Sequence, residues 1–597
     1  MKRIFRYSLL SLTAVMAMFT TACDDFFDTD PDNILNVNDY ISSENEMYRG
    51  FLGIITRMQN AGDHPIFLTD TRCNFLEIAP NAPVALQDIY NYEPTDGNEY
   101  ADPTCYYEII TACNDYFDKM SEYQTKIGSS MSETAAADFP KLVSSALRIK
   151  VWAYYTLGRI YGKAVYFDDA LEEIKDLSDA TTFTPLNSML EVANKCIEML
   201  DNGITLDNGN HFAADLVMDW PAWIDPETQN TAYDYWNYLT PPWLLMRAEL
   251  MSWRASYTNN QADWLWIRDN ILEYLNNLYL NVDGSVPSDK TPDYYYNLCI
   301  PLTHNYYNIF FSEQVGYDYQ LICGIMYDYD NGQRNRLVQY FCPAYPGDGF
   351  YLQPSQYGMD SYVETDIRSY TQLLTMYPIN GSIAFTKYYY SRKGGTSPEY
   401  LRTNIFEIQP TIILYRGHDY HFLLAEAENH LGNWHQTKTI LNNGLENEFA
   451  EGRVDGVPVE DGWDARYNSW FGTSGGYGNV GIVGCALGKE YDLPVPDEDG
   501  NFYVTDANGV KRAITEEERI KIYDLALADE YLLEYTGEGK SYSYLCKMAE
   551  RYKAAGDAQA DTIVSNRIAP KYSPAMQAKV RAAIANNYFI DWNLSGN

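Results

Sequence analysis

Apolar residues recur at helical spacing in several segments of the chain. The clearest segment is Phe139–Tyr161, which places Leu142, Ala146, Ile149 and Leu157 on one stripe. Gly162 follows this segment and is a typical C-terminal stop. By the same pattern we expect helices over Glu44–Met58, Tyr106–Met120, Phe139–Tyr161, Leu186–Leu200, Pro242–Tyr257, Trp264–Leu278, His418–Leu431, Trp434–Leu445 and Glu516–Tyr535.

Four long stretches between these segments show no helical period: Thr71–Asp102, Val282–Ser312, Tyr327–Thr403 and Glu451–Val510. Loops of this length are usually functional or disordered. Because the first three are rich in aromatic residues, we expect them to be ordered. The pattern therefore predicts a mainly α protein, in which a scaffold of helix pairs displays large irregular aromatic loops. The helix pairs resemble tetratricopeptide hairpins, although no strict 34-residue period is present.

The first 22 residues have the layout of a secretory signal peptide. Three cations lie within the first six residues, the apolar stretch Leu9–Phe19 follows, and two small residues lead to Cys23. The apolar stretch is too short for a membrane-spanning helix. A small residue followed by cysteine is similar to the lipobox of bacterial lipoproteins, although Thr20 stands where leucine is usual. We therefore expect lipidation of Cys23; the alternative is an ordinary cleaved signal with a structural cysteine nearby.

The net charge of −39, from 82 acidic and 43 basic residues, disfavours partners that are themselves anionic. Such a field repels nucleic acid and anionic lipid head groups, and it suits a neutral ligand better than an anionic one. The chain also contains 54 Tyr and 12 Trp. These side chains combine a flat apolar face with a polar edge, which suits sugar rings, although most of them are expected to fill helix contacts.

Six places in the chain carry motifs that occur together in one known family. They are Cys23–Asp28 with Pro31, Tyr106–Met120 with Asn114, Ala146–Gly162, Phe310–Tyr327, Tyr415–Gly432 and Glu530–Leu545. Together these places resemble the SusD/RagB family, the surface lipoproteins of glycan-uptake systems in Bacteroidetes. The closest match is Tyr415–Ala427, which is similar to the family's Arg-x-Ala-Asp-x-x-Leu-x-x-Ala-Glu-Ala helix. Tyr531, Ser541 and Tyr544 stand where the family has arginine, arginine and aspartate, so the chain resembles a divergent member.

This resemblance implies a SusD-like scaffold and a division of the chain. Residues 1–22 would be the signal peptide, 23–40 a lipidated tether and 41–597 a single globular body. Within the body, about 41–260 would form an N-terminal helical scaffold and about 261–597 a C-terminal RagB/SusD-like part with loop insertions.

The resemblance also implies a function without catalysis. The protein would be a lipid-anchored, surface-exposed lipoprotein of the outer membrane that captures oligosaccharide. It would then deliver the ligand to a SusC-like TonB-dependent transporter. A peptide-binding uptake lipoprotein of the RagB type and a surface glycosidase remain the alternatives.

In the family, the ligand site is assembled from the loop after the first helices and from loops in the middle of the chain. In this sequence these are Asp70–Tyr92 and roughly Tyr294–Tyr319. The resemblance therefore indicates six tyrosines for stacking and three residues as hydroxyl partners, although packing alone is the alternative for each. The tyrosines are Tyr90, Tyr92, Tyr306, Tyr307, Tyr317 and Tyr319, and the hydroxyl partners are Asp70, Arg72 and Asn74.

The remaining motifs concern buried charged residues, catalysis and cofactors. We interpret Arg416, Asp419 and Glu426 as structural groups that satisfy buried polar atoms. Gly472–Gly476 fits a hydrolase nucleophile elbow, but no histidine follows it in the chain. No pattern indicates a catalytic metal or an organic cofactor. The acidic run from Asp28 to Asp39 imitates part of a calcium loop, which leaves room for a structural calcium ion.

Overall fold

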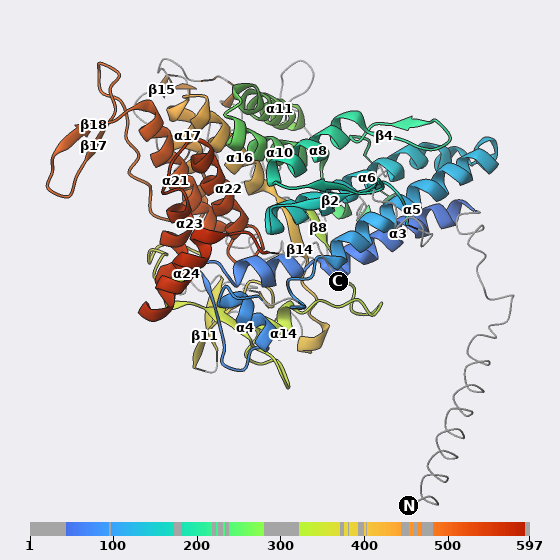
Figure 1. Ribbon diagram of the computed structural model, residues 1–597, viewed down its shortest axis with the longest axis horizontal. Coiled ribbons are helices and arrows are strands. Elements are labelled where there is room, and N and C mark those ends of the chain that lie inside the picture. The colour runs from blue at the N-terminus through green and yellow to red at the C-terminus, as the bar shows by residue number, and fades with distance from the viewer. Residues whose placement is uncertain are drawn as a thin grey trace, which may run out of the picture.

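The computed structural model in Figure 1 describes most of residues 43–591. The described residues exclude 95–96, 172–180, 218–222, 225–230, 233–237, 280–320, 370–374, 380, 392–398, 401–402, 443, 445–452, 455–456, 459–463, 465 and 468–480. The expected signal peptide, the lipidated Cys23, the tether and the calcium-like run therefore lie outside the described residues.

Four helices from the first third of the chain pack side by side: α3 (Glu44–Ala61), α5 (Thr104–Ile127), α6 (Glu133–Tyr161) and α8 (Met189–Asn202). The last of these follows the ribbon of β2 (Ala164–Tyr166) and β3 (Thr184–Leu186). All four helices were expected from the apolar pattern.

The start and the end of α6 have clear local causes. The Ser132 side chain accepts a hydrogen bond from the Ala135 N–H at the start. At the end, Gly162 adopts a φ of +71°, and an added Cβ would lie 2.7 Å from the Phe589 ring. Only glycine fits both conditions, so the predicted stop is confirmed.

A second group of helices continues this packing: α10 (Trp243–Thr258), α11 (Gln261–Tyr279), α16 (Gly417–His430) and α17 (Trp434–Leu441). Helix α10 packs on α8 and α11, and α16 packs on α11 and α17. One hydrophobic core runs through the described residues, from Met47 to Ile590. The prediction of a mainly α fold is confirmed.

The C-terminal helices are α21 (Glu516–Glu534), α22 (Ser541–Ala554), α23 (Asp561–Ile568) and α24 (Pro574–Asn586). The sequence pattern predicted α21 but not the other three. Helix α22 buries Lys547 and Arg551 beside its apolar residues, so its inward face is not apolar in sequence. Helix α24 is rich in alanine and buries only Val580 and Ile584.

The strands of the described residues form two-stranded antiparallel ribbons. The longest ribbon pairs β8 (Leu321–Ile325) with β14 (Ile412–Arg416), and Ile412 lies opposite Ile325. The other ribbons are β1 (Leu76–Ile78) with β9 (Leu352–Pro354), β4 (Ile204–Thr205) with β5 (His211–Phe212), β6 (Trp223–Ile224) with β7 (Thr231–Ala232), β10 (Met376–Ile379) with β11 (Ser382–Phe385), β12 (Tyr390–Ser391) with β13 (Glu399–Tyr400), β15 (Arg453–Val454) with β16 (Val457–Pro458), and β17 (Tyr503–Thr505) with β18 (Lys511–Ala513).

Short helices and turns lie between the longer elements. Figure 1 shows α4, α14 and β11 grouped on the side of the helices that is away from α10, α11 and α17. We call the described residues of 62–102 and 326–411 the loop layer. The short elements are the π-helical turn η3 (Ile66–Asp70), α4 (Val84–Tyr90), η4 (Gly128–Ser130), α14 (Leu337–Phe341), α15 (Gln356–Met359), η5 (Ile405–Glu407), α20 (Gly481–Cys485) and η6 (Ala569–Lys571).

A buried ion network joins α16 and α21 to the loop layer. Arg416 donates to Glu534 at 2.7 Å and to Glu538 at 3.0 Å. Glu534 also accepts from Arg368 at 2.7 Å, and Glu538 accepts from Lys387. All five side chains are at most 5% exposed. Burial opposes the charge on Glu534, but its neighbours, beginning with His418 and Arg416, hold its pKa well below the ordinary value.

The other two residues interpreted as structural are also buried and internally paired. Asp419 accepts from Lys540 at 2.9 Å, and Glu426 accepts from Lys547 at 2.7 Å. These contacts join α16 to the start and the middle of α22. The structural interpretation of Arg416, Asp419 and Glu426 is therefore confirmed.

Two of the positions that depart from the motifs quoted above contact one another. Tyr531 on α21 and Tyr544 on α22 stack with ring centroids 4.0 Å apart and an interplanar angle of 8°. In this chain the two helices are therefore joined at these positions by a pair of aromatic rings.

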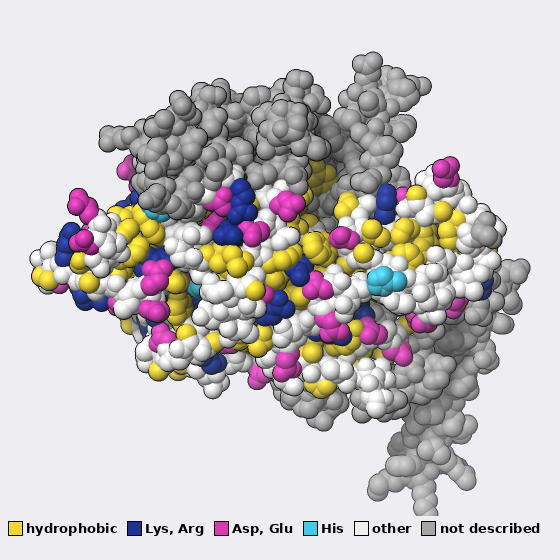
Figure 2. All heavy atoms as spheres, turned by 90° about the horizontal axis from the view of Figure 1, so that it is seen from above, with side chains coloured by type: hydrophobic (Ala, Val, Ile, Leu, Met, Phe, Trp, Pro, Cys, Tyr) yellow, Lys and Arg dark blue, Asp and Glu magenta, His cyan; other side chains and the backbone are white. Residues whose placement is uncertain are grey.

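The surface over the helices opposite the loop layer carries a mixture of side-chain types. Figure 2 looks onto the helices at the top of Figure 1, where acidic, basic and hydrophobic side chains are interspersed. None of the helices that the structure describes is both long and apolar enough to cross a bilayer. Eight cysteines fall within the described residues and all are free thiols, seven of them buried.

Replacing Arg416 tests the ion network. We expect Arg416→Leu to lower the free energy of unfolding by about 3–5 kcal/mol, because it removes one cationic partner from each of two buried carboxylates, which then keep Arg368 and Lys387. The exposed pair of Arg512 and Glu518 supplies the control, and Arg512→Leu should cost less than about 1 kcal/mol. Urea unfolding followed by circular dichroism measures both. Equal losses for the two variants would contradict a special role for the network.

Candidate ligand-binding site

The ribbon of β8 and β14 brings distant segments together at one end. Because the strands are antiparallel and Ile325 lies opposite Ile412, the chain leaving β8 and the chain entering β14 start from the same end. The segment after β8 leads into α14, and the segment before β14 contains η5. The C-terminal end of α3 packs against β8. Three parts of the sequence therefore meet at one place in the loop layer.

A pocket of about 650 Å³ lies where these segments meet. The α3 end contributes Gln59, Asn60 and Asp63, and the η5 segment contributes Phe406 and Gln409. The remaining lining residues, which come mainly from the chain around α14, are Tyr329, Arg334, Asn335, Arg336, Val338, Gln339, Tyr345, Ile405 and Ile408. The lining thus combines side-chain amides, aromatic rings and a few charges.

Hydrogen bonds between the segments fix the walls of the pocket. The Gln59 amide donates to the Met326 carbonyl at 2.7 Å and to the Gln333 amide oxygen at 2.8 Å. Gln409 accepts from the Asn335 backbone N–H at 2.8 Å. Because each bond joins residues far apart in sequence, the pocket is built by tertiary structure and not by one loop.

An ion pair closes one side of the pocket. Arg336 donates through Nε and Nη2 to the two carboxylate oxygens of Asp63, at 3.1 and 2.7 Å. The guanidinium also lies 4.8 Å from the centre of the Phe67 ring. Burial acts against the charge, but the hydrogen bonds and charge of Asp63 outweigh it and raise the pKa of Arg336. Both carboxylate oxygens of Asp63 are therefore bound by Arg336.

Aromatic rings form another side. Tyr345 and Phe406 contact edge to face, with centroids 5.2 Å apart and an interplanar angle of 74°. Phe406 is 42% exposed, which is unusual for phenylalanine. Asn60 is exposed beside them. A ring face next to amides is an arrangement that can take a sugar ring, whose C–H face stacks while its hydroxyls form hydrogen bonds.

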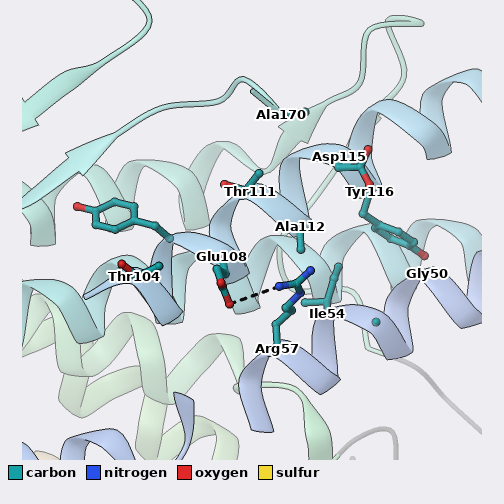
Figure 3. A pocket seen from close by; sticks show the side chains of 12 residues that line it. Gly50, Ile54, Arg57, Thr104, Glu108, Thr111, Ala112, Asp115, Tyr116 and Ala170 are labelled. Carbon is teal, nitrogen blue, oxygen red and sulfur yellow. Dashed lines mark hydrogen bonds and ion pairs between the residues drawn. The ribbon is translucent and has the colours of Figure 1, made fainter. Parts of the chain in front are cut away.

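A second hollow lies on the helical scaffold between α3 and α5 and has a volume of about 560 Å³. Figure 3 shows that Arg57 and Glu108 reach toward one another across it, 3.3 Å apart. Gly50, Gly53 and Ala112 contribute little side chain to its walls. Its described lining contains no side-chain amide, whereas the pocket of the loop layer has several amides beside the exposed Phe406 ring. We therefore consider the pocket of the loop layer the better ligand site.

The described residues contain no group of three or more His, Cys, Asp or Glu side chains that could hold a metal ion. The acidic residues proposed to resemble a calcium loop lie outside that part of the chain. The expectation of no cofactor, with a structural calcium ion allowed, stays a prediction.

Four of the sequence-predicted site residues are buried in the loop layer. Asp70, Arg72, Asn74 and Tyr92 are at most 8% exposed. The Arg72 guanidinium lies between two rings, 4.3 Å from Tyr92 and 4.6 Å from Tyr542. These positions give the four side chains packing roles within the protein. As ligand contacts they stay a prediction.

The other five predicted residues divide into two groups. Tyr90 is half-buried against Tyr572, with ring centroids 4.8 Å apart. Its role in ligand binding also stays a prediction. Tyr306, Tyr307, Tyr317 and Tyr319 lie outside the described residues.

Sequence reasoning did not name the residues that line the pocket. Tyr329 and Tyr345 belong to the aromatic stretch Tyr327–Thr403, which was recognised as a long loop but not as part of a site. Phe406 and Gln409 lie directly before the best family match, at Tyr415. The local signal that could have indicated the pocket is the cluster of tyrosine, amide and arginine residues in Tyr329–Gln339.

Comparison with known proteins gives matches at the level of structure only. No protein-family model matches the chain, and no curated protein matches it in sequence. A SusD homolog from Bacteroides thetaiotaomicron superposes with a TM-score of 0.53 at 12% identity, covering 93% of this chain and 94% of that chain. A SusD superfamily protein from Bacteroides vulgatus gives 0.52 at 13% identity, covering 90% and 92%.

The chain has the SusD fold. A third solved structure, surface glycan-binding protein A from Bacteroides uniformis, agrees with this at a TM-score of 0.51 and 14% identity, covering 90% of this chain and 93% of that chain. The fold that the sequence motifs imply is therefore confirmed, and the low identity fits the divergence seen at Tyr531 and Tyr544.

Asp70 gives this SusD-like chain a testable pH dependence. Its Oδ2 accepts from the Gly539 N–H at 2.7 Å, and burial raises its pKa to about 7 from 3.8, although that hydrogen bond acts in the opposite direction. Unfolded chains release this proton near pH 4. Folding therefore takes up a proton between about pH 4 and 7, and this contribution to stability is lost as the pH rises through that window.

We expect Asp70→Asn to remove this contribution while keeping an acceptor for Gly539. The variant should gain stability relative to wild type as the pH rises from 4 to 8. The gain should be about 1.4 kcal/mol for each unit by which folding raises the pKa of Asp70. Urea midpoints across this pH range measure it, with the exposed Asp207→Asn as control. A difference between Asp70→Asn and wild type that does not change with pH would contradict the assignment.

Proposed function

We propose that this protein is a lipid-anchored, cell-surface glycan-binding protein that captures oligosaccharide and delivers it to a SusC-like TonB-dependent transporter of the outer membrane. The observation that carries the proposal is the pocket of the loop layer, in which the exposed Phe406 ring and the half-buried Tyr345 ring lie beside amide side chains. The name of the structure from Bacteroides uniformis, a surface glycan-binding protein, supports the same class of ligand.

Binding without catalysis suits the chemistry of the pocket. Among the described residues that line it, the one carboxylate is that of Asp63, and Arg336 holds it through two hydrogen bonds between Nε, Nη2 and the two carboxylate oxygens. Glycoside hydrolysis generally needs two carboxyl groups on either side of the scissile bond. We therefore propose that the ligand leaves unchanged.

The location is proposed from the sequence. A positively charged start, a short apolar stretch and Cys23 support export and lipidation, and several acyl chains would hold the protein on the membrane. A bound oligosaccharide would then be retained at the cell surface, next to the transporter that takes it up.

Removing one ring from the pocket tests the site. We expect Phe406→Ala to weaken binding of the best oligosaccharide from a glycan array by about 5- to 30-fold. The reason is the loss of roughly 1–2 kcal/mol of stacking free energy between the ring and the sugar. Isothermal titration calorimetry on the full chain, in a detergent without a sugar head group, measures the affinity. Tyr345→Ala should have a similar effect, because the two rings contact one another.

Tyr274 provides a matched control, because it is 40% exposed but lies on α11, on the other side of the molecule. Tyr274→Ala should leave the affinity unchanged. Equal affinities for wild type and Phe406→Ala would place the site elsewhere. Shortened oligosaccharide products would overturn binding without catalysis, and binding confined to peptides would favour the peptide-uptake alternative.

Replacing Cys23 tests the anchor. In a Bacteroides host, we expect the wild-type chain to sediment with membranes and Cys23→Ser to lose this association, because no thiol remains for acylation. Immunoblots of membrane and soluble fractions measure the distribution. Membrane association of Cys23→Ser equal to that of wild type would contradict lipidation at this residue.

A further inference from the structure

Arg334 is held in one orientation at the edge of the pocket. Its guanidinium carbon lies 3.8 Å from the centre of the Tyr329 ring, which fixes the plane of the group. Its Nη1 donates to two backbone carbonyls, of Tyr329 at 2.7 Å and of Gln333 at 2.8 Å. Both N–H bonds of Nη1 are thereby used, and the side chain is exposed.

The Nε and Nη2 atoms of Arg334 form no hydrogen bond with the described residues, and no described carboxylate lies within ion-pair distance of the group. These two nitrogens make up one of the paired edges by which arginine binds two oxygens at once. Stacking and the Nη1 bonds orient this edge before any ligand arrives, which lowers the entropic cost of binding.

The neighbouring arginine shows which group such an edge binds. Arg336, two residues further along and lining the same pocket, uses its Nε and Nη2 to hold the two carboxylate oxygens of Asp63. Arg334 presents the same edge in the same pocket.

The local charge supports an anion, although the whole chain carries −39. Of the lining residues that the structure describes, those with a charge are Asp63, Arg334 and Arg336. Since Asp63 and Arg336 neutralise one another, Arg334 leaves the lining with one positive charge. Asp328 and Asp330 lie nearby on the same turn, but both are exposed and Asp328 accepts hydrogen bonds from Asn331. Solvent screens their repulsion.

We propose that Arg334 binds a carboxylate of the ligand, so that the oligosaccharide taken by this pocket carries uronic acid units. This inference rests on the proposed function and adds the chemical class of the glycan. It differs from the neutral ligand that the overall charge favours, because the arrangement around one side chain decides the contact. Tyr345 and Phe406 would stack on a ring, and Arg334 would select the sugar that bears the acid.

The test compares each acidic oligosaccharide with its own methyl ester, which keeps the length and linkage but removes the charge. The probes are hexagalacturonic acid and a hyaluronan hexasaccharide. Titration calorimetry on the full chain, in the same detergent, should show that at least one acid binds at least about tenfold more tightly than its ester. Raising the salt concentration should weaken the binding of the acid and leave the binding of the ester unchanged.

Two substitutions of Arg334 separate charge from geometry. Arg334→Gln should abolish the preference for the acid and leave the ester within about threefold of its wild-type affinity. Arg334→Lys keeps the charge without the paired edge, so it should retain only part of the preference. Arg512→Gln, an exposed arginine on the β17–β18 ribbon, is the control and should behave as wild type.

The outcomes distinguish this inference from the function on which it rests. Equal binding of acid and ester, unchanged by Arg334→Gln, would overturn the carboxylate contact and leave glycan binding intact. Binding of neutral hexasaccharides of xylose or mannose, with no binding of either acid, would do the same. An absence of binding to every oligosaccharide on a glycan array would contradict the proposed function itself.

Discussion

The buried ion pairs around Arg416 are the constraint on which the rest of the structure depends. Arg416 ends β14 and is the N-cap of α16. Its charge is satisfied by Glu534, the last residue of α21, and by Glu538 in the turn that follows. Isolated charges in a protein interior are costly, so removing one of these groups destabilises the others. The turn between α21 and α22 is thereby fixed against the start of α16.

The same turn holds the loop layer. Glu538 binds Lys387, and the Gly539 N–H donates to Asp70. Segments that are more than 150 residues from the turn in sequence are therefore positioned by it. The pocket lies in the same loop layer, beside the β8–β14 ribbon and the end of α3. The scaffold thus supplies a rigid support, and the loop layer supplies the chemistry.

How much could be predicted from the sequence depends on the kind of interaction. Helix α6 was predicted because its apolar stripe and its terminal glycine are local signals. Helix α22 was missed because Lys547 and Arg551 occupy its buried face and are satisfied by Glu426, a residue from another helix. The structural roles of Arg416, Asp419 and Glu426 were predicted from their positions in a family motif.

The site was harder to predict than the fold. Arg72 and Tyr92 have the chemistry of ligand contacts, but they stack on one another and on Tyr542. Whether such side chains face a ligand or the interior is decided by distant partners. The pocket joins residues between 59 and 409, and a single sequence does not show that these positions meet.

The position of a bound oligosaccharide tests the central claim most directly. A crystal structure of the protein with the tightest ligand from a glycan array should show a sugar ring against Phe406 or Tyr345, with ligand oxygens within about 3.2 Å of pocket nitrogens. Density for the ligand in the groove between α3 and α5, or at any place outside the loop layer, would contradict the account.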